Sequence, residues 1–218
     1  MKLSRPEMIA LALLVAAVAV GVWGYLTLPA GATIPINYTG LDGQPHAHMA
    51  KGPGLALIPT ICGIVLLSVG ASTRILLGRR ELQGTAEVRD LLITTLAALF
   101  VVVEAALVAQ AMDTHFDAFR WIFLATAVLL LLVGNVLGKL RHNFALGVRT
   151  PWTLSDARVW DKTHRFTGRL MVAGALVLAA IAGFLPSHPL LVATLVLAAA
   201  GPMIAGAVYS ARLAAHQG

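Results

Sequence analysis

Residues 8–28 read MIALALLVAAVAVGVWGYLTL and contain no charged side chain. A helix rises about 1.5 Å per residue, so about 20 apolar residues in helical form cross the hydrocarbon core of a bilayer. The rest of the chain has the same character, because 58% of its 218 residues are hydrophobic and only 12% are charged. Soluble domains carry about 25% charged residues. The sequence therefore predicts an integral membrane protein with no room for a catalytic domain outside the membrane.

Five further apolar runs occur, at 54–73, 91–112, 119–138, 170–186 and 189–211. We expect an all-α fold with six transmembrane helices in a single transmembrane domain over 1–218. The first run should be retained as a helix, because it is longer than the core of about 7 to 15 residues in a signal peptide. The last two runs are separated only by Pro186–Pro189, so they should form a helical hairpin.

The basic residues predict the orientation of these helices. Of the 16 Lys and Arg residues, 14 fall before the first run, after the last run, or in the segments 74–90 and 139–169; Lys51 and Arg120 fall on the other side. Cytoplasmic segments of membrane proteins are enriched in Lys and Arg. We therefore expect both termini and both segments to be cytoplasmic. The net charge of +6 is then a signal of topology, and we expect no direct binding of nucleic acid.

Residues 29–53 form the longest segment expected on the outer side, and they are rich in Gly, Pro, Asn and Asp. Residues 34–38 predict a short extended piece and residues 41–43 a turn, so we expect an ordered loop. His46 and His48, together with Asp42, could bind a metal ion. Two histidines in a loop are a weak signal, and we expect no metal site.

Glu104 interrupts the third run near its middle. An ionised carboxylate is costly at that depth, so it should be protonated, paired or directed into a polar cavity, and a functional role is the first hypothesis. The alternative is a neutral side chain hydrogen-bonded to another helix through Ser68, Thr94 or Asn135. The single cysteine, Cys62, excludes an intramolecular disulfide.

The end of the fourth run carries Gly134 and Gly138, a Gly-x-x-x-Gly spacing that lets another helix backbone approach closely. This spacing permits self-association without requiring it, so it leaves the oligomeric state open. Asn135 lies between the glycines, near the membrane boundary. Its amide needs a partner there, which is either a neighbouring helix or a ligand.

The segment 139–169 predicts structure of its own. Thr150-Pro151 forces the chain out of a helix, and Thr153 or Ser155 can then cap a new helix with Asp156 in its first turn. Apolar residues recur at helical spacing over 156–169. We therefore expect one amphipathic interfacial helix in the loop between the fourth and fifth transmembrane helices.

Residues 139–169 contain seven basic residues against two aspartates. An ordinary positive-inside loop next to membrane lipids explains the charge alone. The functional alternative is a binding site for a phosphate, a lipid headgroup or an acidic protein surface. That site would use Arg149, Trp152, Trp160, Lys162, His164 and Arg165.

These segments resemble the SdpI family over Gly134–Asn143, Gly147–Asp156 and Val159–Arg165, followed by Gly168. We place an SdpI-like core at 119–186. The outer loop is also similar to a domain of unknown function that often precedes SdpI-type sequences, with Asn37 where that motif usually has a histidine. That resemblance covers the first helix pair, 1–73.

The resemblance implies a bacterial inner-membrane protein that protects the cell from a secreted antibacterial toxin and holds a cognate autorepressor at the membrane. The outer loop would face a peptide toxin through Pro35, Asn37, Gly40, Asp42, Gly43 and Lys51. The residues that would bind the small transcriptional repressor or another ligand lie in the cytoplasmic motif: Asn135, Lys139, Arg141, Asn143, Arg149, Thr150, Pro151, Trp152, Ser155, Asp156, Trp160, Lys162, His164 and Arg165.

A second hypothesis is a small transporter or a lipid- or anion-handling protein, in which Glu104 and Asn135 line a polar path. The sequence has no Gly-rich nucleotide loop, no supported Ser/His/Asp set and no His-Glu-x-x-His motif. We therefore expect no catalytic residues and no cofactor. A membrane enzyme that acts on lipid through Asp161, His164 and Arg165 is the weakest alternative.

Overall fold

The computed structural model describes residues 4–37, 47–76, 79–113, 115–144, 146–185 and 188–215. Its elements, in order, are α1 (Arg5–Thr27), β1 (Thr33–Asn37), β2 (Ala47–Ala50), α2 (Lys51–Leu76), α3 (Arg79–Met112), α4 (Ala118–Leu137), α5 (Pro151–Ser155), α6 (Ala157–Phe184) and α7 (His188–Ala215). Six of these helices, all except α5, are long and apolar enough to cross a membrane. The prediction of six transmembrane helices is confirmed.

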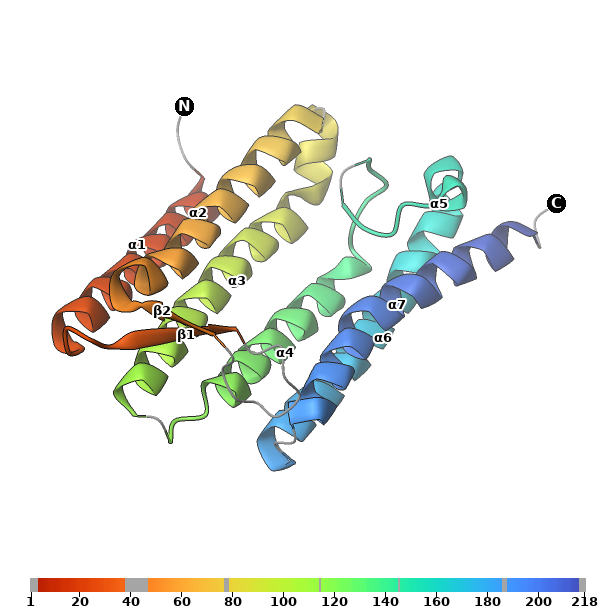
Figure 1. Cartoon of the computed structure of the whole chain (residues 1–218). Coiled ribbons are helices and arrows are strands. Elements are labelled where there is room, and N and C mark those ends of the chain that lie inside the picture. The colour runs from red at the N-terminus through yellow and green to blue at the C-terminus, as the bar shows by residue number, and fades with distance from the viewer. Residues whose placement is uncertain are drawn as a thin grey trace.

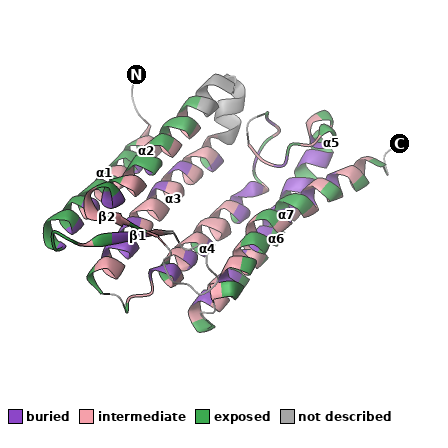
Figure 2. Cartoon of the chain, in the orientation of Figure 1, coloured by how far each residue is buried: buried purple, intermediate pink, exposed green. Residues whose placement is uncertain are grey.

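The long helices form two groups of three, which lie side by side (Figure 1). In the first group α1, α2 and α3 contact one another, and in the second α4, α6 and α7 do the same. Among the described residues, the contacts between the two groups of long helices are made by α3 and α4. Much of the outward-facing surface of the long helices is exposed (Figure 2). The exposed side chains there include large apolar ones, such as Leu26, Leu67 and Leu197. Such faces suit contact with lipid tails.

A two-stranded antiparallel hairpin joins α1 to α2 at one end of the bundle (Figure 1). Its register pairs Thr33 with Ala50 and Ile34 with Met49. Ile34 is fully buried in a cluster with Leu28, Leu55 and residues of α3. The predicted extended piece is confirmed over 34–37, and the predicted all-helical architecture is confirmed apart from this short hairpin. The expected site residues Gly40, Asp42 and Gly43 lie outside the described residues.

The helices after residue 150 differ from the prediction in where they begin and end. Thr150, and neither Thr153 nor Ser155, caps the short α5; its hydroxyl accepts from the main-chain N–H of Thr153. Asp156 caps α6, and its side chain accepts from the main-chain N–H of Arg158 at 2.6 Å. The predicted interfacial helix over 156–169 is therefore not a separate helix. It is the first half of α6, because no proline separates it from the apolar run that follows.

Two glycines hold α4 and α6 close together. A Cβ atom on Gly134 would lie 2.9 Å from the carbonyl oxygen of Gly168, and one on Gly168 would lie 2.5 Å from the carbonyl oxygen of Gly134. A Cβ on Gly138 would lie 3.1 Å from the Arg165 side chain. The predicted close approach at the Gly-x-x-x-Gly spacing is confirmed, and it is used inside the chain.

Candidate functional site

The segment between α4 and α6, with the first turns of α6, is held in place by buried polar side chains. We call residues 138–156 the motif loop. Figure 1 shows it with α5 at the opposite end of the bundle from the β-hairpin. The hydrogen bonds that fix it come from Trp160 and His164 on α6 and from Asn143 and Thr153 within the loop.

Trp160 fastens the start of the motif loop to α6. Its side chain is fully buried, and its Nε1–H donates to the carbonyl oxygen of Leu140 at 2.7 Å. Val88 of α3 and Val136 of α4 belong to the same apolar cluster. The predicted role of Trp160 in binding a partner is therefore corrected: the indole lies in the core, out of reach of a partner.

His164 fastens the middle of the loop. The main-chain N–H of Val148 donates to its Nε2 at 3.0 Å, so Nδ1 carries the proton and donates to the carbonyl oxygen of Trp160 at 2.8 Å. The imidazole is neutral in this arrangement, since a charged ring has no acceptor nitrogen. Gly147 has a φ of 104°, and a Cβ there would clash with Nε2. With both nitrogens used and the ring buried, His164 has no surface through which to bind a partner.

Two polar residues complete the loop. Asn143 donates from Nδ2 to the carbonyl oxygen of Arg141 at 2.8 Å and accepts from the main-chain N–H of Leu146 at 2.7 Å. Thr153 donates from its hydroxyl to the carbonyl oxygen of Val148 at 2.9 Å. Both side chains are fully buried, so the site expected at Asn143 is also a structural contact.

Thr150 lies 2.9 Å from the hydroxyl of Ser210, which ties the loop to α7. Asp156 is used as the cap of α6. The exposed members of the predicted site are Asn135, Lys139, Arg141, Arg149, Pro151, Trp152, Ser155, Lys162 and Arg165.

Four exposed basic residues follow one face of α6 and form a surface that we call the basic stripe. They are Arg158, Lys162, Arg165 and Arg169. Their spacing of four, three and four residues places them on one side of the helix. Arg158 and Arg169 were not among the predicted site residues, although this helical spacing is visible in the sequence.

A groove of about 350 Å³ lies beside the basic stripe, between α4 and α6. Asn135, Arg165 and Arg169 line it, and Gly134, Gly138, Gly168 and Val172 complete it. None of the three polar side chains has a hydrogen-bond or ion-pair partner within the described part of the chain. The amide and guanidinium groups can therefore bind an anion there.

Lys51, the first residue of α2 after the hairpin, bonds to the main chain at the end of α1. Lys51 donates from Nζ to the carbonyl oxygens of Tyr25 at 3.0 Å and Leu28 at 2.9 Å. The ammonium also lies 4.6 Å from the centre of the Tyr25 ring. Lys51 thus caps the C-terminal end of α1, and its role toward a partner stays a prediction. Pro35 is buried in β1, and Asn37 ends that strand.

Glu104 lies on α3, and its carboxyl group lies beside Gly21 of α1, because a Cβ on that glycine would be 2.8 Å from Oε1. The same Cβ position lies 3.2 Å from the carbonyl oxygen of Leu55 on α2. It is fully buried, and neither carboxyl oxygen has a hydrogen-bond partner among the described residues. The predicted hydrogen bond through Ser68, Thr94 or Asn135 is therefore wrong. The shared polar path with Asn135 is wrong as well, because Asn135 lines the α4–α6 groove.

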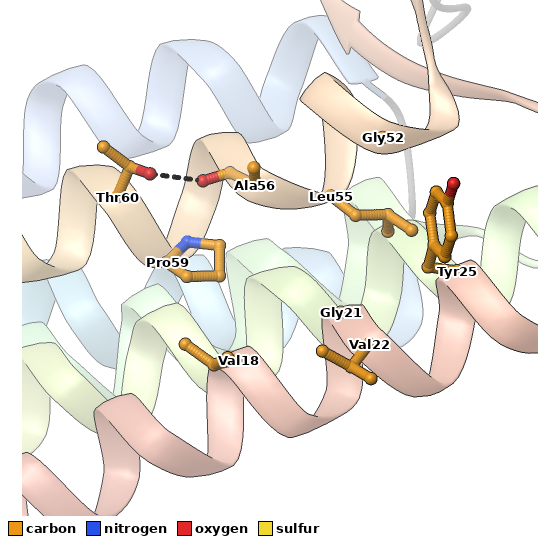
Figure 3. A pocket seen from close by; sticks show the side chains of 9 residues that line it. All are labelled: Val18, Gly21, Val22, Tyr25, Gly52, Leu55, Ala56, Pro59 and Thr60. Atoms are coloured by element: carbon orange, nitrogen blue, oxygen red, sulfur yellow. Dashed lines mark hydrogen bonds between the residues drawn. The ribbon is translucent and has the colours of Figure 1, made fainter.

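A second groove, of about 390 Å³, lies between α1 and α2 (Figure 3). Gly21 and Leu55 belong both to this groove and to the surroundings of the carboxyl group. Within the described residues, no group of three or more His, Cys, Asp or Glu side chains could hold a metal ion. Of the weak metal pattern in the outer loop, His46 and Asp42 lie outside these residues.

Comparison with known proteins finds a family match in the part of the chain that contains the motif loop. The model of the SdpI/YfhL protein family matches residues 139–206, which cover most of the motif loop, all of α6 and most of α7. The chain is also similar to "Immunity protein SdpI" of Bacillus subtilis (strain 168), with 24% identity over 159 residues, which are 73% of each protein. No solved structure matches the chain.

Proposed function

Because the chain belongs to the SdpI family, we propose that it is a membrane immunity protein that protects a bacterial cell from a secreted antibacterial toxin. The similarity to an immunity protein extends over 73% of the chain, so it covers more than residues 139–206, which the family model matches. The six long apolar helices suit a multispan protein of the inner membrane. The toxin would act from outside, where the β-hairpin between α1 and α2 offers an ordered surface.

The distribution of Lys and Arg supports an orientation with the motif loop and both termini in the cytoplasm. The hairpin and the motif loop lie at opposite ends of the bundle (Figure 1). In this orientation, one end of the protein faces the toxin and the other faces the cytoplasm.

The observation that carries the proposal is that the basic stripe lies on α6, whose opposite face is packed into the core. Trp160 and His164 occupy the buried face of α6, while Arg158, Lys162 and Arg165 are exposed on the other face. A rigid, basic, exposed helix face fits an acidic protein surface. We propose that this face holds a cognate autorepressor at the membrane when toxin is present.

Survival tests the immunity role. A strain of the native host without this gene is grown in medium conditioned by its toxin-secreting parent. We expect a loss of survival that wild-type protein restores. Unchanged survival of the deletion strain contradicts the immunity role.

A reporter fused to the chain's own promoter tests the basic stripe. We expect Arg158→Ala/Lys162→Ala to abolish induction by toxin, while Arg158→Lys/Lys162→Arg keeps it because the charge is retained. Both variants should accumulate in the membrane at the wild-type level. Normal induction in the alanine variant contradicts the proposed repressor surface.

The α4–α6 groove supports a second function, the handling of a lipid phosphate or another anion. Asn135, Arg165 and Arg169 converge on it, and basic pockets on the cytoplasmic side of membrane helices bind anionic headgroups. Native mass spectrometry of the purified protein tests this function. We expect a retained anionic phospholipid that Arg165→Ala/Arg169→Ala loses and Arg158→Ala/Lys162→Ala keeps; equal retention by all three proteins contradicts it.

A further inference from the structure

Glu104 needs a positive charge or a proton that its surroundings do not supply. The carboxyl group is fully buried within a membrane-spanning helix, and no described side chain or main-chain group bonds to it. An unpaired carboxylate in such a place is strongly disfavoured. The folded protein must therefore bind a proton or a cation at this position.

The helices around α3 bring no compensating side chain. α3 contacts α1, α2, β1 and α4. The described titratable and charged groups on these elements are Arg5, Glu7, Tyr25, Lys51, Cys62 and Arg120. None of them bonds to Glu104, and the ammonium group of Lys51 is used by the end of α1.

The space beside the carboxyl group exists because residue 21 is a glycine. The position that a Cβ of Gly21 would occupy lies 2.8 Å from Oε1 of Glu104 and 3.2 Å from the carbonyl oxygen of Leu55. Two oxygen atoms from different helices thus border the same small space. The Leu55 carbonyl oxygen can accept a hydrogen bond or bind a cation, and so can the Glu104 carboxylate. Once protonated, the carboxyl group can donate a hydrogen bond instead.

Pro59 leaves the carbonyl of Leu55 without its usual helical donor. In an α-helix this carbonyl accepts from the N–H four residues later, and proline has no N–H. Pro59 lies inside α2, next to Thr60, whose hydroxyl donates to the carbonyl of Ala56 at 2.6 Å. Figure 3 shows Leu55, Pro59 and Gly21 around the groove between α1 and α2. The groove provides a route from the surface to the wall of this space.

We propose that the carboxylate of Glu104 and the main-chain carbonyl of Leu55 form a binding site for one small monovalent cation, entered through the α1–α2 groove. Carbonyl groups freed at interrupted helices, together with carboxylates, are the oxygen ligands that take Na⁺ or a proton within membrane proteins. Water can complete the coordination shell through the groove. The site lies in the first group of helices, away from the motif loop, so it stands or falls independently of the proposed immunity role.

Thermal unfolding of the full chain in detergent tests the site. The midpoint is measured in sodium chloride and in choline chloride of equal ionic strength, each at acidic and at basic pH. A cation that binds only the folded state raises the midpoint with its concentration. A midpoint raised by sodium at basic pH identifies Na⁺, and one raised by acid but indifferent to sodium identifies a proton.

Two Glu→Gln variants on the same helix show whether Glu104 causes the response. We expect Glu104→Gln to lose the sodium- or proton-dependent shift, because the amide is neutral and needs no cation. Glu87→Gln is the matched control, since Glu87 is exposed and pairs with Lys139 at 3.1 Å. A wild-type midpoint that responds to neither cation, or a response equal in wild type and Glu104→Gln, overturns the site.

Chemical modification tests the same carboxyl group in the wild-type protein, so the result does not depend on whether Glu104→Gln folds. Dicyclohexylcarbodiimide is an apolar reagent that modifies protonated carboxyl groups, and peptide mass spectrometry locates the adduct. We expect an adduct on Glu104 that decreases as pH rises, and that sodium suppresses if Na⁺ is the ligand. Absence of the adduct, or modification independent of both pH and sodium, overturns the site.

Pro59→Ala tests the part played by Leu55. Alanine restores the N–H that donates to the Leu55 carbonyl, while Glu104 is untouched. We expect a smaller cation-dependent shift than in the wild type, with the residual shift still lost in Glu104→Gln. A shift equal to that of the wild type overturns the assignment of Leu55 to the site.

Discussion

The motif-loop half and the hairpin half of this protein both bury polar side chains, but they satisfy them differently. In the first, Trp160, His164 and Asn143 are fully buried, and each makes a hydrogen bond of 3.0 Å or shorter to the main chain of the motif loop. In the second, both oxygens of Glu104 have no partner among the described residues. In one half, internal hydrogen bonds offset the cost of desolvating neutral side chains. In the other half, the larger cost of burying a carboxylate has no such offset among the described residues.

Neutral hydroxyl groups do not alter this comparison. Thr163 and Thr167 of α6 also have buried, unpaired hydroxyl oxygens. A neutral hydroxyl costs much less to leave unpaired than a carboxylate. Among the buried groups described, Glu104 is therefore the one that most needs a ligand. The buried polar residues that hold the motif loop already have partners.

The largest expected effect is at Trp160. Trp160→Ala should lower the free energy of unfolding by about 3–5 kcal/mol, because it empties a buried indole site and leaves the Leu140 carbonyl unpaired. Trp160→Phe keeps most of the packing and loses the hydrogen bond, so it should cost about 1–3 kcal/mol. Chemical denaturation in detergent micelles measures both. A Trp160→Ala protein as stable as the wild type would show that the motif loop is not docked on α6.

Two leucine substitutions test the comparison, because they should change the free energy of unfolding in opposite directions. His164→Leu leaves the Val148 N–H and the Trp160 carbonyl without partners and should lower stability by about 2–3 kcal/mol. Glu104→Leu removes an unpaired carboxyl group and should raise stability by about 1–3 kcal/mol in sodium-free buffer at basic pH. The same denaturation experiment compares them. Loss of stability in both variants would mean that Glu104 has a stabilising partner after all.

The sequence predicts the six spans well, because mean hydropathy reports directly which solvent a helix prefers. It predicts an extended piece at residues 34–38, of which 34–37 belong to β1, but it does not predict the pairing with β2. It does not predict that α6 runs unbroken from Ala157 to Phe184. Helical periodicity gives no end point where an amphipathic stretch leads into an apolar one without a proline.

The site is harder to predict because residue type alone does not tell the inner face of a helix from the outer face. The sequence pattern alone places Trp160 and His164 among the binding residues, beside Lys162 and Arg165. Their spacing of four residues places the two aromatic side chains together, away from the basic stripe, and this much could have been inferred. The position of Glu104 was also predictable. Its lack of a partner was not, since it depends on Gly21 and on contacts between three helices.

A smaller effect is expected at Lys51, where the hairpin half does pair a charge with the main chain. Lys51→Met should lower stability by about 1–2 kcal/mol, because the carbonyls of Tyr25 and Leu28 lose a charged donor. Lys51→Arg, which keeps the charge and the donors, should cost less. Thermal unfolding of the two variants measures the difference, and equal stability would contradict a capping role for the ammonium group.

The smallest effect on stability is expected on the exposed face of α6. It separates the basic stripe from the buried residues Trp160 and His164, which hold the motif loop in place. Arg158→Ala/Lys162→Ala should change the free energy of unfolding by no more than about 0.5 kcal/mol, because both side chains are exposed and neither makes a hydrogen bond or ion pair with the described part of the chain. The buried neighbours Trp160 and His164 on the same two turns should each cost several times more. Denaturation of the double variant beside His164→Leu makes this contrast directly. If the double variant is as unstable as His164→Leu, the basic stripe is part of the fold, and its loss of signalling could no longer be assigned to a partner.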